Sequence, residues 1–178
     1  CIKHFPGHGN TSVDSHTTLP IIESEKNKFR SIDLPPFKDA IDAGVKMVMT
    51  AHISIPAIDD SKLPATLSNK ISKKILRDDF GFKGIIVTDA MEMGGITETF
   101  WSSEAAVRTI EAGSDIVLLP LDNDTAIKGV LNAVKSGRIS IKRIDQSVQK
   151  ILHAKQELGL WDEREVPLSK ARRILGNG

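Results

Sequence analysis

The residues of this sequence that could carry chemistry gather near its start. The stretch begins with Lys3-His4-Phe5-Pro6-Gly7-His8-Gly9 and continues with Asp14-Ser15-His16, so three of the five histidines lie within the first sixteen residues. Glycine lets such a loop turn tightly, and proline stiffens it. Histidines in a loop can bind a metal or hydrogen-bond to the neighbouring backbone, although no clean zinc-ligand spacing is present. Spacing alone leaves a metal site and a structural loop open.

A second candidate is Asp89, which follows the apolar run Ile85-Ile86-Val87-Thr88. It is expected where a buried strand ends and the next loop begins, which is the catalytic face of barrel enzymes. The carboxylate is well placed to act there, but an aspartate after a strand also commonly caps the following helix. His52 ends its own apolar run, and either substrate contact or core packing would explain it. Met91, next to Asp89, is typical of an apolar lining.

The elements that must position these residues alternate between strand and helix. Continuous apolar runs favour strands that are covered on both faces, as in parallel α/β sheets. Such runs lie at 45–50, 84–88 and 115–119, and a fourth, at Cys1-Ile2, is cut short by the chain start. Apolar spacing and glycine stops predict helices over 34–43, 68–79, 102–112, 124–136 and 144–158. The tail from 161 to 178 is interpreted as a docked or frayed end.

Length and composition restrict the class of protein. The chain has 178 residues, fewer than the roughly 250 of a complete (β/α)8 barrel. A net charge of +1 predicts no nucleic-acid partner, and no apolar run approaches the roughly 20 residues of a membrane span. The single cysteine, Cys1, fits a reducing compartment without demanding one. We expect a cytoplasmic protein, and secretion stays open if a signal lies upstream.

Two motifs resemble the family 3 glycoside hydrolases of the β-N-acetylglucosaminidase type. One is the stretch from Lys3 to Gly9 with Asp14-Ser15-His16, and the other is Val87-Thr88-Asp89-Ala90-Met91, in the family's order. The likeness runs from residue 1 to about 160 and includes 48–52 and 63–68. It implies an α/β fold that forms the C-terminal half of a TIM (β/α)8 barrel, strands five to eight with their helices. That half would cover 1–160, with 161–178 as a C-terminal tail.

The resemblance also implies a reaction. Terminal β-linked N-acetylglucosamine, from peptidoglycan fragments, would be removed by retaining double displacement without metal or organic cofactor. Asp89 would be the nucleophile that forms a covalent glycosyl-enzyme. His16 would be the acid/base, with Asp14 orienting its ring and stabilising its protonated form. The expected substrate-binding residues are Lys3, His4, His52 and Met91.

The family's barrel begins well upstream of this sequence. Half a barrel exposes two sheet edges, so the missing N-terminal half-barrel or a second copy of the chain is the expected partner. Three alternatives stay open: a family 3 β-glucosidase or phosphorylase, a non-catalytic sugar-binding or assembly half-barrel, and a metal-dependent hydrolase that uses His4, His8 and His16. The pair of Asp14 and His16 argues against a glucosidase.

Overall fold

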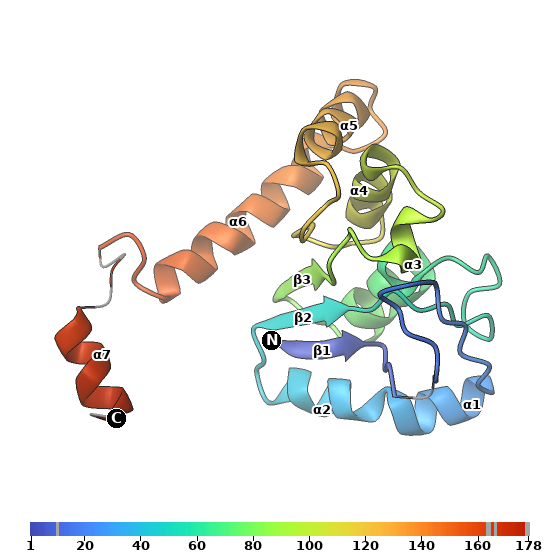
Figure 1. Cartoon of the computed structure of the whole chain (residues 1–178), viewed down its shortest axis with the longest axis horizontal. Helices are drawn as coiled ribbons and strands as arrows, with labels where there is room; N and C mark the ends of the chain where they lie inside the picture. The colour runs from blue at the N-terminus through green and yellow to red at the C-terminus, as the bar shows by residue number, and fades with distance from the viewer. Residues whose placement is uncertain (10, 163–164, 166, 177–178) are drawn as a thin grey trace.

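The centre of the molecule is a small parallel β-sheet (Figure 1). The structure is a computed structural model and describes residues 1–9, 11–162, 165 and 167–176. Three strands lie in the order β1-β2-β3 and run in the same direction: β1 (Ile2–Phe5), β2 (Met47–Thr50) and β3 (Ile85–Thr88). Parallel neighbours need crossover connections, and helical segments supply them here. The predicted α/β class is confirmed.

Burial explains why these segments form strands. All four residues of β3 are buried, as expected for a β-branched run that is covered on both faces. In β2, buried and partly exposed side chains alternate. The first strand is longer than the two residues predicted, because it extends to Phe5, whose side chain is fully buried. Lys3 and His4 therefore lie within β1.

The strand predicted at residues 115–119 does not form among the described residues. A single parallel bridge joins Ile116 to β3. Leu118 donates its backbone N–H to the hydroxyl of Thr88 instead of to a strand carbonyl. Leu119 has a φ of 44°, outside the extended region that a strand requires. The apolar run thus lies beside β3 without continuing the ladder, and the prediction of a strand at residues 115–119 is wrong.

The long helical segments agree with the predicted ranges to within a few residues. They are α2 (Pro35–Asp42), the π-helical η3 (Asn69–Asp79), α4 (Ser102–Glu111), α5 (Asn123–Lys135) and α6 (Ile141–Glu157). Shorter elements not predicted are α1 (Lys26–Lys28), the π-helical η1 (Phe29–Asp33), the 3-10 turn η2 (Ala65–Leu67) and α3 (Gly94–Thr97). In Figure 1, α1 and α2 lie beneath the sheet, and α4 and α5 lie on its other side.

Local sequence sets several of these boundaries. The side chains of Ser68, Asp122 and Ser140 each accept a hydrogen bond from the backbone N–H three residues on, which satisfies a free donor of the first helical turn. Gly44 and Gly113 follow α2 and α4 with φ values of 88° and 104°. Such left-handed conformations suit glycine after a helix.

The main hydrophobic core lies between the sheet and the helical segments beside it. Its fully buried members come from the three strands, the segment after β2, η2 and η3, and include Phe5, Val48, Ile86 and Leu76. Phe29 of η1 joins this cluster with an exposed fraction of 1%. Packing from both sides holds the sheet in place, so the strands position the loops that follow their carboxyl ends.

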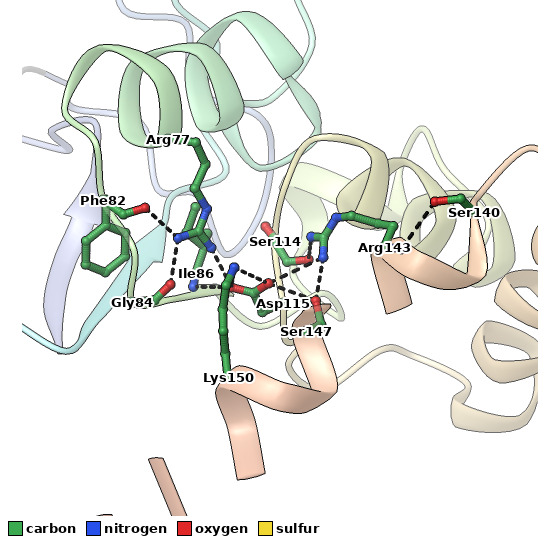
Figure 2. A network of polar contacts seen from close by, with 10 residues as sticks. All are labelled: Arg77, Phe82, Gly84, Ile86, Ser114, Asp115, Ser140, Arg143, Ser147 and Lys150. Carbon is green, nitrogen blue, oxygen red and sulfur yellow. Dashed lines mark hydrogen bonds and ion pairs between the residues drawn. The ribbon is translucent and has the colours of Figure 1, made fainter. Parts of the chain in front are cut away.

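A buried ion network anchors α6 to the amino end of β3 (Figure 2). The carboxylate of Asp115 is fully buried and lies 2.5 Å from a guanidinium nitrogen of Arg77, 3.4 Å from Arg143 and 3.1 Å from Lys150. It also accepts a hydrogen bond from the backbone N–H of Ile86 at 3.1 Å. Three cations from η3 and α6 thus converge on one carboxylate.

The C-terminal segment contains one more helix, α7 (Leu168–Leu175), which lies apart from the sheet and its helices (Figure 1). Apolar residues at helical spacing follow Pro167 and account for this helix, which the sequence did not predict. That residues 161–178 form a docked or frayed tail stays a prediction. Residues 163–164, 166 and 177–178 of the predicted tail lie outside the described residues. No helix in the described part of the chain is long and apolar enough to cross a membrane.

Candidate active site

Asp89 lies directly after β3, at the carboxyl end of the sheet. Its backbone N–H donates to the carbonyl of Thr50 at 2.9 Å, which ties it to the end of β2. Its Oδ1 accepts from the backbone N–H of Ala90 at 2.9 Å, and its Oδ2 lies 3.6 Å from Nε2 of His4. The next helix starts five residues later with Met93 as its N-cap, so Asp89 does not cap a helix. Its side chain keeps 20% exposure and is available to react.

His4 brings β1 into the same site. The pairing between β1 and β2 shifts register between Ile2 and Phe5, where Lys3 and His4 lie, and such irregularities often redirect side chains next to active sites. Burial lowers the pKa of His4, and the nearby carboxylate of Asp89 only partly opposes this. His4 is therefore neutral at pH 7, which suits a hydrogen-bonding role more than an ionic one. Lys3 is exposed beside it.

Asp14 and His16 form a contact within their loop, as the sequence predicts. Nδ1 of His16 lies 2.7 Å from Oδ1 of Asp14, and the same oxygen accepts the backbone N–H of His16 at 3.0 Å. These two hydrogen bonds lower the pKa of Asp14, so the carboxylate stays ionised in mild acid. The side chain of His16 is 76% exposed. This arrangement leaves Nε2 as the nitrogen for proton transfer.

His52 and Met91 lie beneath the site. His52 is fully buried, with Nε2 2.9 Å from the carbonyl oxygen of Ala90 and Nδ1 2.9 Å from the hydroxyl of Thr66. Burial lowers the pKa of His52, so the ring is neutral and Nε2 donates to the carbonyl. Met91 is 3% exposed and packs with Leu67. Both residues therefore support the segment that carries Asp89, and their contact with substrate stays a prediction.

Several residues at the site were not predicted from the sequence. Thr66 joins His52, and the pair Gly94 and Gly95 lies against the loop of Asp14 and His16. A Gly-Gly pair shortly after a candidate nucleophile signals a close backbone approach, but not which segment approaches. A contact between segments that are distant in the sequence can be identified only from the three-dimensional structure.

A large cavity of the molecule lies apart from these residues. A cavity of about 800 Å³ lies between η3, α4 and α6, and its lining includes none of Asp89, His4 and His16. Among the described residues, no group of three or more histidine, cysteine, aspartate or glutamate side chains could hold a metal ion. His4, His8 and His16 therefore do not form the metal centre that one alternative required.

Comparisons with known proteins point to one family. A family model described as the glycosyl hydrolase family 3 N terminal domain matches residues 1–154. Beta-hexosaminidase A of Pseudoalteromonas piscicida is 36% identical over 196 residues, which cover 99% of this chain and 32% of that protein. The structure of a glycoside hydrolase family 3 beta-N-acetylglucosaminidase from Paenibacillus sp. str. FPU-7 is 42% identical, with a TM-score of 0.88 over 93% of this chain and 32% of that chain.

A more distant similarity concerns a different reaction. The structure of a beta-glucoside phosphorylase is 28% identical and has a TM-score of 0.89 over 96% of this chain and 33% of that chain. This chain spans about a third of the length of each of these three proteins.

Proposed function

Because the chain belongs to glycosyl hydrolase family 3, whose N-terminal domain is a TIM-barrel-like α/β fold, we propose that it carries the reacting groups of a β-N-acetylglucosaminidase. The observation that supports this most directly is the geometry at the carboxyl end of the sheet. There, a partly exposed Asp89 faces His4, and a paired Asp14 and His16 occupy the loop after β1. The β-hexosaminidase names of the relatives favour N-acetylglucosamine as the sugar.

In the first step, a carboxylate oxygen of Asp89 attacks the anomeric carbon. The bond from that carbon to the leaving oxygen breaks, and the protonated Nε2 of His16 gives its proton to the leaving group. The hydrogen bond from Ala90 to Oδ1 restricts the rotation of the carboxylate, while Oδ2 stays on the side of His4. The product of this step is a covalent glycosyl-enzyme.

In the second step, water attacks the same carbon. Neutral Nε2 of His16 takes a proton from the water, and the bond to Asp89 breaks. Two inversions give net retention of the β configuration. This proton transfer restores the acid for the next cycle, while Asp14 holds Nδ1 of the ring at 2.7 Å and keeps Nε2 directed outwards.

The binding residues and the partner follow the same proposal. We assign Lys3 and His4 to hydrogen bonds with sugar hydroxyls, and His52 and Met91 to the floor of the site. The chain would supply strands five to eight of the barrel, and the N-terminal half-barrel or a second copy would close the site. The source of the substrate would be peptidoglycan fragments, which carry N-acetylglucosamine.

The test is release of nitrophenol from its β-N-acetylglucosaminide and its β-glucoside, by the wild-type chain and by Asp89→Asn. We expect turnover of the first substrate only, loss of at least a thousandfold in the variant, and a first-formed sugar with the β configuration. Asp39→Asn, on the exposed surface of α2, is the matched control and should keep full activity. Turnover that Asp89→Asn retains would contradict the proposed role of Asp89.

Phosphorolysis is the second candidate reaction, because the structural similarity to the β-glucoside phosphorylase extends over 96% of this chain. Added inorganic phosphate should leave the rate of hydrolysis unchanged, with free sugar as the product. A phosphate-dependent rate with a sugar 1-phosphate as product would replace hydrolysis by phosphorolysis. Sugar binding without turnover, in a chain with intact Asp89 and His16, would instead support a non-catalytic sugar-binding half-barrel.

A further inference from the structure

The loop that carries Asp14 and His16 is attached through the residue between them. Ser15 is buried at 5% exposure, whereas the side chains of Asp14 and His16 are 62% and 76% exposed. Within residues 11–19, Ser15 is the only buried residue. The loop therefore fixes its centre to the protein and presents the two reactive side chains outwards.

Two contacts hold Ser15 in place. Nε2 of His8 lies 2.9 Å from its hydroxyl, and the backbone N–H of Gly95 donates to its carbonyl at 3.4 Å. The backbone N–H of Gly94 donates to the carbonyl of His16 at 3.0 Å. Gly94 and Gly95 begin the helix α3, only five residues after Asp89. The loop of the acid/base pair thus rests directly on the segment of the nucleophile.

The close approach explains why glycine occupies both positions. A Cβ atom on Gly94 would lie 2.1 Å from the carbonyl oxygen of Thr17, which no side chain can accept. A Cβ atom on Gly95 would lie 3.3 Å from the carbonyl oxygen of Ser15 and 3.2 Å from Cβ of His52. Neither position has the left-handed φ that often selects glycine. The requirement is therefore for space, and the occupant of that space is the loop.

We propose that His8, Gly94 and Gly95 are positioning residues that fix the loop of Asp14 and His16 against the segment of Asp89. One contact surface would then set the acid/base and the nucleophile relative to each other, although they come from segments more than 70 residues apart in the sequence. The relative position of the acid/base and the nucleophile matters, because a misplacement of about 1 Å can lower the rate about a hundredfold. This inference rests on the proposed function for its catalytic consequence, but not for the contact itself.

The contact is tested without substrate, by hydrogen exchange of the backbone amides in the 178-residue chain. In His8→Phe, which keeps a ring but removes Nε2, we expect the amide of Gly95 to exchange about tenfold faster than in wild type. In Gly94→Ala, the amide of Gly95 should exchange faster still. Gly9→Ala is the matched control, because a Cβ atom there meets nothing within 4 Å, and it should match wild type.

The amides of β3 report in the same experiment whether each variant is folded. If Gly94→Ala also loses protection in β3, His8→Phe and Ser15→Ala decide the result, since both remove only the hydrogen bond between the two side chains. Wild-type exchange of the Gly95 amide in these two variants would overturn the proposal.

The catalytic consequence is tested with two leaving groups. A displaced loop weakens proton donation, so His8→Phe should lower kcat for an alkyl β-N-acetylglucosaminide at least tenfold more than for the nitrophenyl one, with KM unchanged. Nitrophenolate leaves without needing a proton, which makes it the internal reference. An equal fall for both substrates would overturn the positioning role. Absence of turnover in wild type would count against the proposed function, while the exchange measurement still decides the contact.

Discussion

A neutral buried histidine makes the stability of this fold depend on pH. His52 is fully buried and its pKa lies below the ordinary value of 6.5, mainly because of burial. In the unfolded chain it binds a proton near pH 6.5, whereas the folded protein resists protonation. The unfolded state then holds more protons, so the free energy of unfolding should fall as pH drops below about 6.5. His4, whose pKa burial also lowers, contributes in the same direction.

The change that tests this is His52→Phe. It leaves the partly buried carbonyl of Ala90 without the donor from His52, and we expect a loss of about 2 kcal/mol at neutral pH. It should also reduce the decline in stability between about pH 7 and pH 5. Urea unfolding at several pH values measures both effects. His153→Phe, at an exposed position on α6, is the control and should keep the wild-type pH dependence; an unchanged slope in His52→Phe would contradict the assignment.

A second residue-level prediction concerns the partner of His16. In Asp14→Asn the carboxylate 2.7 Å from Nδ1 of His16 is replaced by an uncharged amide, so the ring loses the charged partner that orients it. We expect kcat/KM to fall about 10- to 100-fold. Because the pKa of Asp14 is lowered, the wild-type carboxylate stays charged in mild acid, and the ratio of wild type to variant should hold down to about pH 5. A ratio that vanishes between pH 7 and pH 5 would show that Asp14 does not act as this charge.

Single residues could be predicted from the sequence where a local motif carries them. Asp14 and His16 lie in one loop and Asp89 ends one strand, so short-range pattern was enough to nominate them. Ser15, Gly94 and His8 matter through a contact between two loops, which no local pattern encodes. His52 shows a third case, because a strand end predicts a polar side chain but not whether that side chain faces the substrate or the core.

At the scale of the elements, the network at Asp115 decides how α6 attaches to the sheet. Burial opposes ionisation of this carboxyl, but Arg77 and the other donors around it together lower its pKa. In Asp115→Asn, three cations lose their shared counter-charge, and we expect a loss of about 3 to 5 kcal/mol in the free energy of unfolding. Thermal or urea unfolding measures it.

The matched control is Asp42→Asn, which removes the exposed pair with Lys38 on α2. Exposed pairs contribute about 0 to 1 kcal/mol, so this variant should be close to wild type. Equal stability losses in the two variants would show that burial does not strengthen the network at Asp115. The stabilisation by Asp115 should be present above its unfolded pKa near 4 and disappear as pH falls through the lower folded value.

The elements themselves were largely predictable, with one instructive exception. Continuous β-branched runs and glycine stops predicted β2, β3 and the long helices, because these signals are local. The same type of run at 115–119 gave no strand. The side chain of Asp115 at its start is held by Arg77 and α6, and Leu119 at its end has a positive φ, which lies outside strand geometry. Tertiary contacts overrode the local preference there.

At the scale of the whole molecule, the surface has unpaired strand edges and exposed apolar side chains, whereas the core is closely packed. The outer edge of β1 pairs with no strand among the described residues, and β3 carries a single bridge on its outer side. Unpaired edges of this kind favour association with another chain or segment. The C-terminal arm, formed by α6 and α7, extends away from the sheet (Figure 1). Large apolar side chains of this arm and of the residues after α6 are exposed, namely Val148, Leu152, Leu158, Trp161, Leu168, Ile174 and Leu175.

Extensive exposed apolar surface favours association with another chain, so we expect the isolated chain to self-associate. Its mass in light scattering should exceed 19.4 kDa and rise with concentration. The double change Leu152→Lys and Leu158→Lys, at residues 43% and 74% exposed, should return the mass towards the monomer without loss of secondary structure.

The control adds the same charge to α6 without removing apolar surface. Gln149→Lys with Gln156→Lys places two lysines at exposed positions, so a purely electrostatic effect would appear in both double variants. If only the leucine changes reduce the mass to that of the monomer, the arm is the surface through which the chain associates with another chain. If the leucine variant stays associated, the outer edge of β1 becomes the candidate site of contact, because it pairs with no strand among the described residues. A wild-type chain that stays monomeric at every concentration would show that neither surface drives assembly between copies.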